Sequence, residues 1–195
     1  VVGRGVDTRL FDPQRHSPAL RQAWGLAPGA LACLYVGRLA AEKNLALIEK
    51  SFAAIQHVLP SAKMIWVGDG PSAARLRSAH PDHYFAGTRL GDDLATHYAS
   101  ADLFLFPSLS ETYGNVVAEA MASGLPVLAY RSAAAAELIV DGVNGRWVAP
   151  GDEEGFRQAA LDMLARADLL PAMGLAARQT MRAHHWGAVV ERFES

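Results

Sequence analysis

The chain has 195 residues, of which 51% are hydrophobic, enough for one domain with a substantial core. Its 18 lysines and arginines nearly balance its 20 aspartates and glutamates, so no global basic field is available to attract a nucleic acid or an anionic bilayer. The single cysteine, Cys33, excludes an internal disulfide framework and a cysteine-based zinc site. With no membrane-spanning apolar run and no signal peptide in sight, we expect a cytoplasmic protein that associates with a membrane at most peripherally.

The sequence opens with VVGRGVDTRLFDP and lacks an initiator methionine, as if it continued from an upstream segment. We therefore expect the chain to be a piece of a longer protein.

Short apolar runs recur along the chain, and each is followed by glycine or proline. Their apolar character is continuous rather than alternating, which is typical of strands buried on both faces of a parallel sheet. The expected strands are residues 31–37, 63–68, 83–87, 102–108, 126–130 and 145–150.

Helical patterns separate these runs. Apolar residues at steps of three and four between 45 and 59 predict a helix that Pro60 ends, and a second helix is expected to open near Asn115 and stop at Gly124. Further helices are expected at 92–100, 133–139, 152–166 and 172–184. This alternation predicts an α/β protein: one Rossmann-like domain over residues 1–195, with a doubly wound parallel sheet of about six strands.

Ligands of such sheets bind beyond the carboxyl ends of the strands. After the run at 102–108, Glu111 and Glu119 surround a turn that contains Gly114 and leads into the helix near Asn115. The free N–H groups of a first helical turn attract a phosphate, and carboxylates accept paired hydrogen bonds from vicinal hydroxyls. The segment predicts a site for a diphosphate with a sugar on each side, as in a nucleotide sugar. The alternative is a helix-favouring Glu111 and a solvated Glu119.

Two cations, Arg38 and Lys43, follow the first expected strand and stand near the start of the next helix. Cations there run against the helix dipole, so they need another partner, which a diphosphate supplies. The alternative is that both are ordinary surface charges.

The segment GDGPSA, residues 68–73, matches a G-x-G-x-x-A dinucleotide pattern and keeps a dinucleotide-dependent oxidoreductase open as an alternative. Two features speak against it. The next strand ends in Gly87, Thr88 and Arg89 rather than in an acidic residue, and Pro71 removes an N–H donor. The histidines at 80, 83 and 97 stand isolated in the sequence, and we interpret them as surface or core residues, with no metal site expected.

Several motifs together carry a resemblance to a known family. GVDTRLFDP, VGRLAAEKN, VGDGP, FAG, ADLFLFPSLSETYGNVVAEAMASGLPVLA and ELIVDGVNGRWVAPGD occur in the order seen in the C-terminal domain of family 4 retaining glycosyltransferases. The chain resembles that domain over nearly its whole length. The resemblance implies the donor-binding half of a GT-B enzyme, with the N-terminal acceptor domain of the same polypeptide outside this chain.

The implied reaction is transfer of a hexose from a UDP- or GDP-linked donor, such as UDP-glucose or GDP-mannose, to a hydroxyl of a glycan or lipid, with retention at the anomeric carbon. The resemblance also implies a role in bacterial cell-surface glycan or glycolipid biosynthesis. It implies no tightly bound cofactor and no metal. The isolated domain is expected to bind donor but to be inactive. A noncatalytic nucleotide-sugar module and a sugar epimerase of the same fold remain alternatives.

Matching positions carry over roles from the family. Arg38 and Lys43 would hold the diphosphate and stabilise the leaving group, Glu111 would bind the transferred sugar near the reacting centre, and Glu119 would hold the ribose hydroxyls. The base would enter the loop 87–90, and backbone groups of 114–116 would meet the phosphates. The remaining implied binding residues are Gly37, Gly87, Thr88, Arg89, Leu90, Tyr113, Gly114, Asn115 and Val116.

The sequence departs from the family pattern in two places. Tyr113 stands where phenylalanine is commoner. Many relatives carry a Gly-Gly pair after the strand that here ends at Tyr130, whereas this chain continues RSAAAAEL, which leaves the shape of that loop open.

Overall fold

The computed structural model describes residues 5–110 and 115–194, with side chains described up to residue 184. The strands are β1 Ala32–Val36, β2 Lys63–Val67, β3 Tyr84–Gly87, β4 Leu103–Phe106, β5 Val127–Tyr130 and β6 Arg146–Val148. The α-helices are α1 Pro18–Ala23, α2 Leu45–Val58, α3 Ala73–Ala79, α4 Gly91–Ser100, α5 Val116–Ala122, α6 Ala133–Leu138, α7 Glu153–Ala165 and α8 Leu170–Glu194. Short 3-10 turns, η1 Pro13–Arg15, η2 Ala41–Lys43 and η3 Ala167–Leu169, complete the elements.

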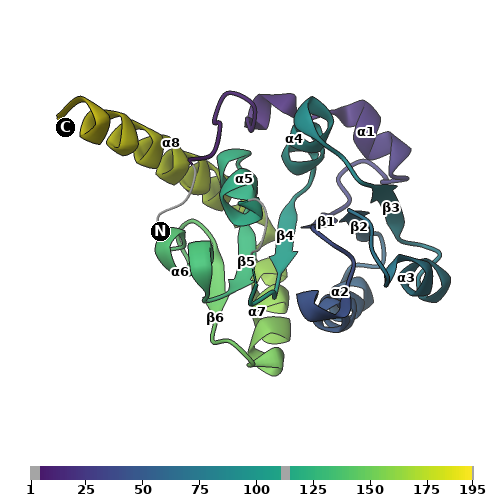
Figure 1. Cartoon of the computed structure of the whole chain (residues 1–195). Coiled ribbons are helices and arrows are strands. Elements are labelled where there is room, and N and C mark those ends of the chain that lie inside the picture. Colours follow the sequence, from purple (N-terminus) through teal and green to yellow (C-terminus); the bar gives the residue numbers. More distant parts are fainter. Residues whose placement is uncertain (1–4, 111–114, 195) are drawn as a thin grey trace.

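The six strands form one parallel sheet in the order β3-β2-β1-β4-β5-β6 (Figure 1). The prediction of a doubly wound Rossmann-like sheet of about six strands is therefore confirmed. After β3 the chain returns to pair β4 with the opposite edge of β1. This reversal between β1 and β4 creates a topological switch point, where the loops at the carboxyl ends diverge and leave room for a ligand.

Helices cover both faces of the sheet, as the continuous apolar runs require. On one face α2 packs against α7, and on the other α4, α5 and α8 pack together (Figure 1). The predicted stripe of α2 is confirmed, because Leu45, Ile48, Phe52 and Ile55 are all buried. Each such burial contributes about 1.5–3 kcal/mol relative to exposure, so packing rather than helix propensity holds α2 in place.

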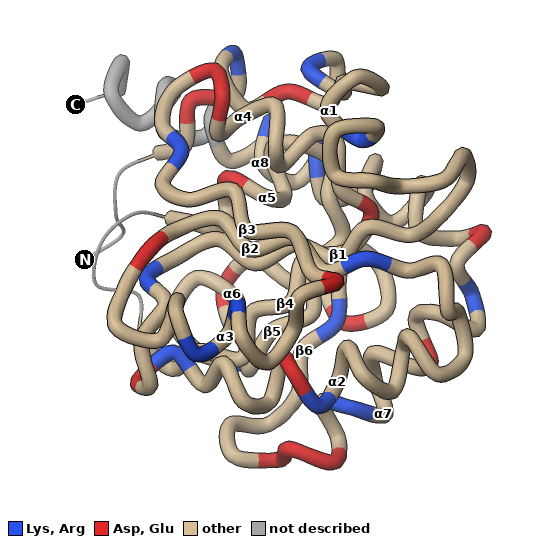
Figure 2. Tube along the Cα trace, turned by 90° about the vertical axis from the view of Figure 1, so that its right-hand side faces the viewer, with Lys and Arg blue, Asp and Glu red and all other residues tan. Residues whose placement is uncertain are grey.

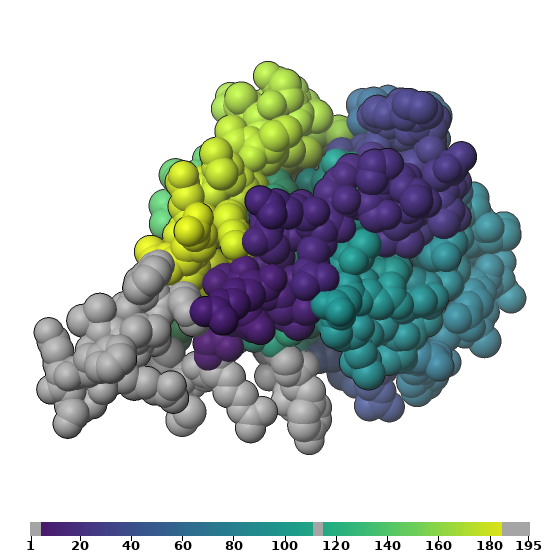
Figure 3. Space-filling view, turned by 90° about the horizontal axis from the view of Figure 1, so that it is seen from above, coloured from purple at the N-terminus to yellow at the C-terminus, as the bar shows by residue number. Residues whose placement is uncertain are grey.

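Arg178 of α8 joins three distant parts of the chain. Its guanidinium donates to the backbone carbonyls of Thr8, Phe11 and Ala122 and pairs with Asp12 at 3.1 Å. Ala122 is the last residue of α5, where a cation also complements the helix dipole. Figure 3 shows the resulting arrangement, with the amino-terminal segment lying against α8. These contacts fix α5, which carries Glu119, to the rest of the fold.

Some elements differ from the expected ones. The helix α1 was not predicted, and α8 is longer than the expected helix at 172–184. Cys33 is buried in β1, as expected of a free thiol in an apolar run, and burial raises its pKa.

Basic and acidic positions are interspersed along the trace in Figure 2. Within the described ranges, every helix is too short or too polar to cross a membrane.

Candidate functional site

The loops after β1 and β2 approach each other closely at the carboxyl ends of the strands. The N–H of Leu39 donates to the carbonyl of Asp69, and a Cβ atom on Gly68 would lie 1.9 Å from the carbonyl oxygen of Gly37. A Cβ atom on Gly70 would lie 2.5 Å from the carbonyl oxygen of Leu39. The two glycines of the G-x-G pattern are therefore required by backbone packing, which explains the pattern without a dinucleotide.

A cavity of about 230 Å³ opens where these loops meet the loop after β3. It is lined by Val36, Gly37, Arg38, Val67, Gly68, Asp69, Thr88 and Arg89. Four predicted binding residues from two separate loops, Gly37, Arg38, Thr88 and Arg89, thus share one cavity. Small-molecule sites usually measure about 300–1,000 Å³, so this cavity has room for one part of a nucleotide sugar.

A larger cavity of about 540 Å³ lies elsewhere, between the first residue of β6, the end of α7 and the start of α8. None of the predicted site residues lines it. Because ligands of doubly wound sheets bind at the carboxyl ends of the strands, the smaller cavity is the better candidate despite its size.

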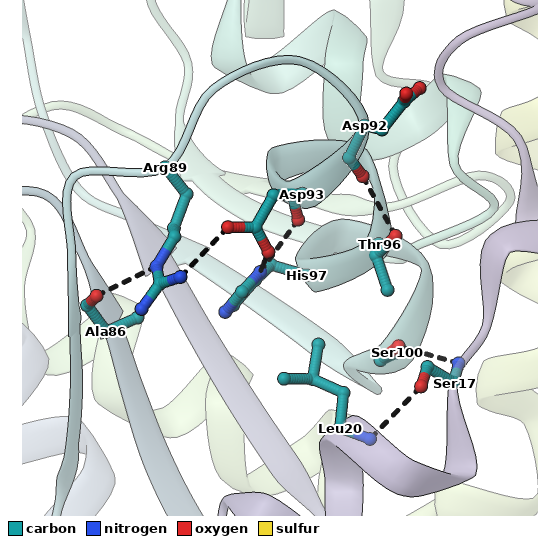
Figure 4. Close-up of polar contacts among 9 residues, drawn as sticks. All are labelled: Ser17, Leu20, Ala86, Arg89, Asp92, Asp93, Thr96, His97 and Ser100. Atoms are coloured by element: carbon teal, nitrogen blue, oxygen red, sulfur yellow. Dashed lines mark hydrogen bonds and ion pairs between the residues drawn. The ribbon is translucent and has the colours of Figure 1, made fainter.

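Arg89 is held by β3 and by α4, as Figure 4 shows. Its Nε donates to the carbonyl of Ala86 at 2.9 Å, and its Nη1 pairs with Asp93 at 2.9 Å. His97 of the same helix contacts the Asp93 carbonyl through Nδ1 at 2.8 Å. These contacts fix the loop of Gly87 to Leu90, and they use only part of the five guanidinium donors of Arg89.

The two predicted cations have different surroundings. Lys43 ends η2 and is only 9% exposed, and its Nζ donates to the carbonyl oxygen of Ser110 at 2.7 Å. The side chain of Arg38 is 61% exposed and lies 3.6 Å from Glu42, an exposed pair of little energetic weight. The interpretation of Lys43 as an ordinary surface charge is therefore wrong, whereas Arg38 is a surface residue at the mouth of the cavity.

Glu119 lies in the first turn of α5. The hydroxyl of Tyr98 in α4 donates to its Oε2 at 2.9 Å. Burial raises the pKa of Glu119, and the bond from Tyr98 opposes that rise. Glu119 is therefore partly buried and hydrogen-bonded, and the alternative of a solvated Glu119 is wrong.

The start of α5 is only partly described. Glu111, Tyr113 and Gly114 lie outside the described residues. Asn115 is the N-cap and Val116 the first residue of α5, which ends before Gly124 as predicted. Asn115 makes no side-chain capping bond, and its Oδ1 is buried without a hydrogen-bond partner among the described groups. The predicted phosphate contacts of this turn remain a prediction.

Ala133 occupies a strained position after β5. Ala133 has a φ of +47°, the left-handed region that glycine adopts freely. The loop for which the resemblance implied a Gly-Gly pair thus adopts a glycine-like conformation here without a glycine.

Replacing Ala133 with glycine is expected to stabilise the chain by about 1 kcal/mol, because the left-handed conformation costs a non-glycine residue about that much. Ala136, exposed in the same helix, is the matched control, and glycine there should destabilise by about 1 kcal/mol. Urea unfolding of both variants measures the two changes. A loss of stability in Ala133→Gly would contradict the inference that the backbone of Ala133 is strained.

Two histidines that stand isolated in the sequence come together in space. The rings of His80 and His83 stack at 4.3 Å, and Asp82 lies with them within metal-binding reach. One nitrogen of each ring is already engaged, because Trp66 donates to Nδ1 of His83 and Nε2 of His80 lies 2.7 Å from Glu49. Burial lowers the pKa of His83 to about 4, so its ring is neutral near pH 7. The group precedes β3, at the end of the sheet away from the cavity, and we assign it a structural role.

Three site residues escaped the sequence analysis. Tyr98 contacts Glu119, Ser110 accepts from Lys43, and Asn44 donates to the carbonyl of Pro107. Asn44 also has a φ of +58° just before α2. An asparagine ahead of a helix is a local signal that could have marked it. Tyr98 has the spacing of an ordinary core residue and gave no such signal.

The fold and these loops define a class: a Rossmann-like α/β domain with a glycine-rich and cationic edge at the carboxyl ends of β1 to β3. The family model for glycosyl transferases group 1 matches residues 30–166. The chain belongs to this family, and its fold is that of one half of a GT-B glycosyltransferase.

Relatives and solved structures agree with this assignment. A GDP-mannose-dependent alpha-mannosyltransferase of Corynebacterium glutamicum is 34% identical over 95% of this chain and 44% of its own length. The Anabaena protein HepE, solved in complex with UDP-glucose, is 25% identical over 91% of this chain and 50% of that chain, with a TM-score of 0.72. The C-terminal domain of a Francisella tularensis group 1 protein superposes with a TM-score of 0.75 at 20% identity, over 93% of this chain and 98% of that chain. The chain thus spans less than half of the mannosyltransferase.

Proposed function

We propose that this chain is the donor-binding domain of a retaining glycosyltransferase that moves a hexose from a UDP- or GDP-linked sugar to an acceptor hydroxyl. The observation that carries the proposal is the shared cavity of Gly37, Arg38, Thr88 and Arg89 at the carboxyl ends of β1 to β3. Membership of the glycosyl transferase family supports the same assignment. The relatives include users of both bases, since one is named for GDP-mannose and another is solved with UDP-glucose.

In this proposal the ligand lies across the switch point. The base occupies the cavity beside Thr88 and Arg89, and the diphosphate extends toward Arg38 and Lys43. Glu119 accepts hydrogen bonds from the ribose hydroxyls, and Glu111 binds the transferred sugar. The acceptor, a glycan or lipid hydroxyl, meets the sugar in a cleft that a second domain of the same polypeptide completes.

The chemistry assigned to this domain is stabilisation of the leaving group. Negative charge grows on the diphosphate as the bond to the sugar breaks, and a cation that meets this charge lowers the barrier. Lys43 suits the role because its ammonium is mostly withdrawn from water, where charge interactions are stronger. The proposal needs no metal ion for this step, and it gives the isolated chain donor binding without glycosyl transfer.

A thermal-shift panel tests the proposal, with UDP, GDP, UDP-glucose, GDP-mannose and NAD as ligands. A ligand at a hundred times its dissociation constant adds about 2.7 kcal/mol, or a few degrees for a domain of this size. We expect a shift with the nucleoside diphosphates of one base, reduced in Arg38→Ala and in Glu119→Ala. Lys50→Ala is the matched control, because Lys50 is an exposed cation that also lies 3.6 Å from an exposed glutamate.

The outcomes separate the competing functions. A shift with NAD alone would contradict the proposal and favour the oxidoreductase alternative. An equal loss in Lys50→Ala would mean that the binding depends on overall charge rather than on the cavity. Glycosyl transfer to an acceptor by this chain alone would contradict the assignment of acceptor binding to a second domain.

A further inference from the structure

We propose that Tyr98 is a positioning residue for nucleotide binding: its hydroxyl holds the Glu119 carboxylate in the orientation that accepts hydrogen bonds from the ribose. The inference rests on the proposed function and adds to it a residue of α4, a helix that contributes only its preceding loop to the predicted site. The two residues stand 21 positions apart in the sequence.

The ring of Tyr98 is fixed from two sides. The side chain is fully buried, and the ring of Phe11 meets it edge to face at 5.7 Å. Phe104 of β4 packs against it at 5.8 Å. Paired aromatic rings in a close-packed interior adopt few orientations, so α4 and two other parts of the chain together set the position of the hydroxyl.

This hydroxyl restrains one oxygen of Glu119 and leaves acceptor capacity for a ligand. The bond joins the Tyr98 hydroxyl to Oε2 at 2.9 Å. A carboxylate offers about four lone-pair sites on two oxygens, so it can still accept from vicinal hydroxyls. A flexible glutamate loses rotamer freedom when a ligand orders it, and that loss weakens binding. Because Tyr98 orders the carboxylate beforehand, less freedom remains to be lost.

The same contact favours the charged form of Glu119. Burial raises the pKa of this carboxyl group, and the hydrogen bond from Tyr98 lowers it. Without the hydroxyl the pKa rises further. Since the carboxylate is the better acceptor for ribose hydroxyls, affinity falls as the pH drops through this pKa. The fall should begin at a higher pH in Tyr98→Phe than in the unsubstituted chain.

The alternative is a purely structural contact that ties α4 to α5. A structural contact would contribute to stability, but it would not distinguish a ribose from a 2′-deoxyribose. The discrimination between these two sugars is therefore the informative measurement.

The experiment measures the binding of UDP, GDP and their 2′-deoxy forms by calorimetry. We expect the unsubstituted chain to prefer the ribose form and Tyr98→Phe to reduce that preference by roughly three- to tenfold, the effect of one lost hydrogen bond. Glu119→Ala should abolish the preference, and the double variant should match Glu119→Ala, because Tyr98 acts through Glu119. Tyr84→Phe is the control, because Tyr84 lies at the amino end of β3, away from the cavity. This variant should leave the ribose preference unchanged.

Two results would overturn the role of Tyr98 while leaving nucleotide binding intact: an unchanged ribose preference in Tyr98→Phe, or additive losses in the double variant. Failure of the unsubstituted chain to bind UDP or GDP would contradict the proposed function itself. If Tyr98→Phe unfolds, Phe11→Leu provides the test, since it loosens the ring but keeps the hydroxyl. A full ribose preference in a folded Phe11→Leu chain would then count against the positioning role.

Discussion

Alanine at Gly68 is expected to destabilise the chain by about 3 kcal/mol or more and to abolish nucleotide binding. Gly68 has a φ of +135°, and a Cβ atom there would overlap the carbonyl oxygen of Gly37 at 1.9 Å. Backbone strain of this kind costs about 1–3 kcal/mol, and overpacking costs about as much again. The backbone of Gly37 is held by its hydrogen bond to Val67, so the overlap cannot be relieved without moving the cavity wall.

Gly29→Ala is the matched control for this substitution. Gly29 also has a positive φ, +78°, but a Cβ atom there would meet nothing within 4 Å. Its expected cost is about 1–2 kcal/mol, from the left-handed backbone alone. Urea unfolding measures both variants, and calorimetry with UDP and GDP measures binding. Equal losses of stability at the two positions would show that the contact with Gly37 adds nothing to the backbone strain.

Replacing Lys43 with methionine is expected to weaken the binding of a nucleoside diphosphate by roughly 10- to 150-fold, the usual effect of a lost hydrogen bond to a charged group. Lys43 is the mostly buried cation of the predicted site, and an ammonium group has three donors. The carbonyl and hydroxyl oxygens of Ser110, at 2.7 and 3.4 Å, account for at most two of them. Methionine keeps the apolar stem and removes the charge.

A nucleoside without phosphates and a nucleoside diphosphate together test whether Lys43 acts on the phosphates. Binding of the nucleoside without phosphates should be the same in Lys43→Met and in the unsubstituted chain. Arg38→Ala should have a smaller effect on the diphosphate, because water already screens that exposed side chain. If Lys43→Met weakens nucleoside and diphosphate equally, Lys43 supports the loop of Ser110 rather than the phosphates.

Elements with a strong local pattern were predictable. The burial of both sheet faces forces continuous apolar runs, and these located all six strands. The stripe of α2 and the stop of α5 at Gly124 follow from helical spacing and from the left-handed φ of +71° at Gly124. The short helix α1 was missed because one and a half turns carry too little periodicity to recognise.

The candidate site was likewise predictable only where local motifs mark it. Local motifs named Arg38, Lys43 and Glu119 as candidates, since each stands just after a strand or in the first turn of a helix. They did not indicate that Lys43 is buried and Arg38 exposed. That difference depends on a contact across 67 positions, from Lys43 to the loop of Ser110.

The sequence by itself determined the class of fold, the alternation of strands and helices and the family, because each depends on spacing and residue type along a short stretch of chain. Only the tertiary structure decided which polar groups meet. The bond from Tyr98 to Glu119, the overlap that forbids a side chain at Gly68 and the partner of Lys43 all join residues from different loops or helices. Such contacts arise when the strands align in the sheet, and no local periodicity encodes them.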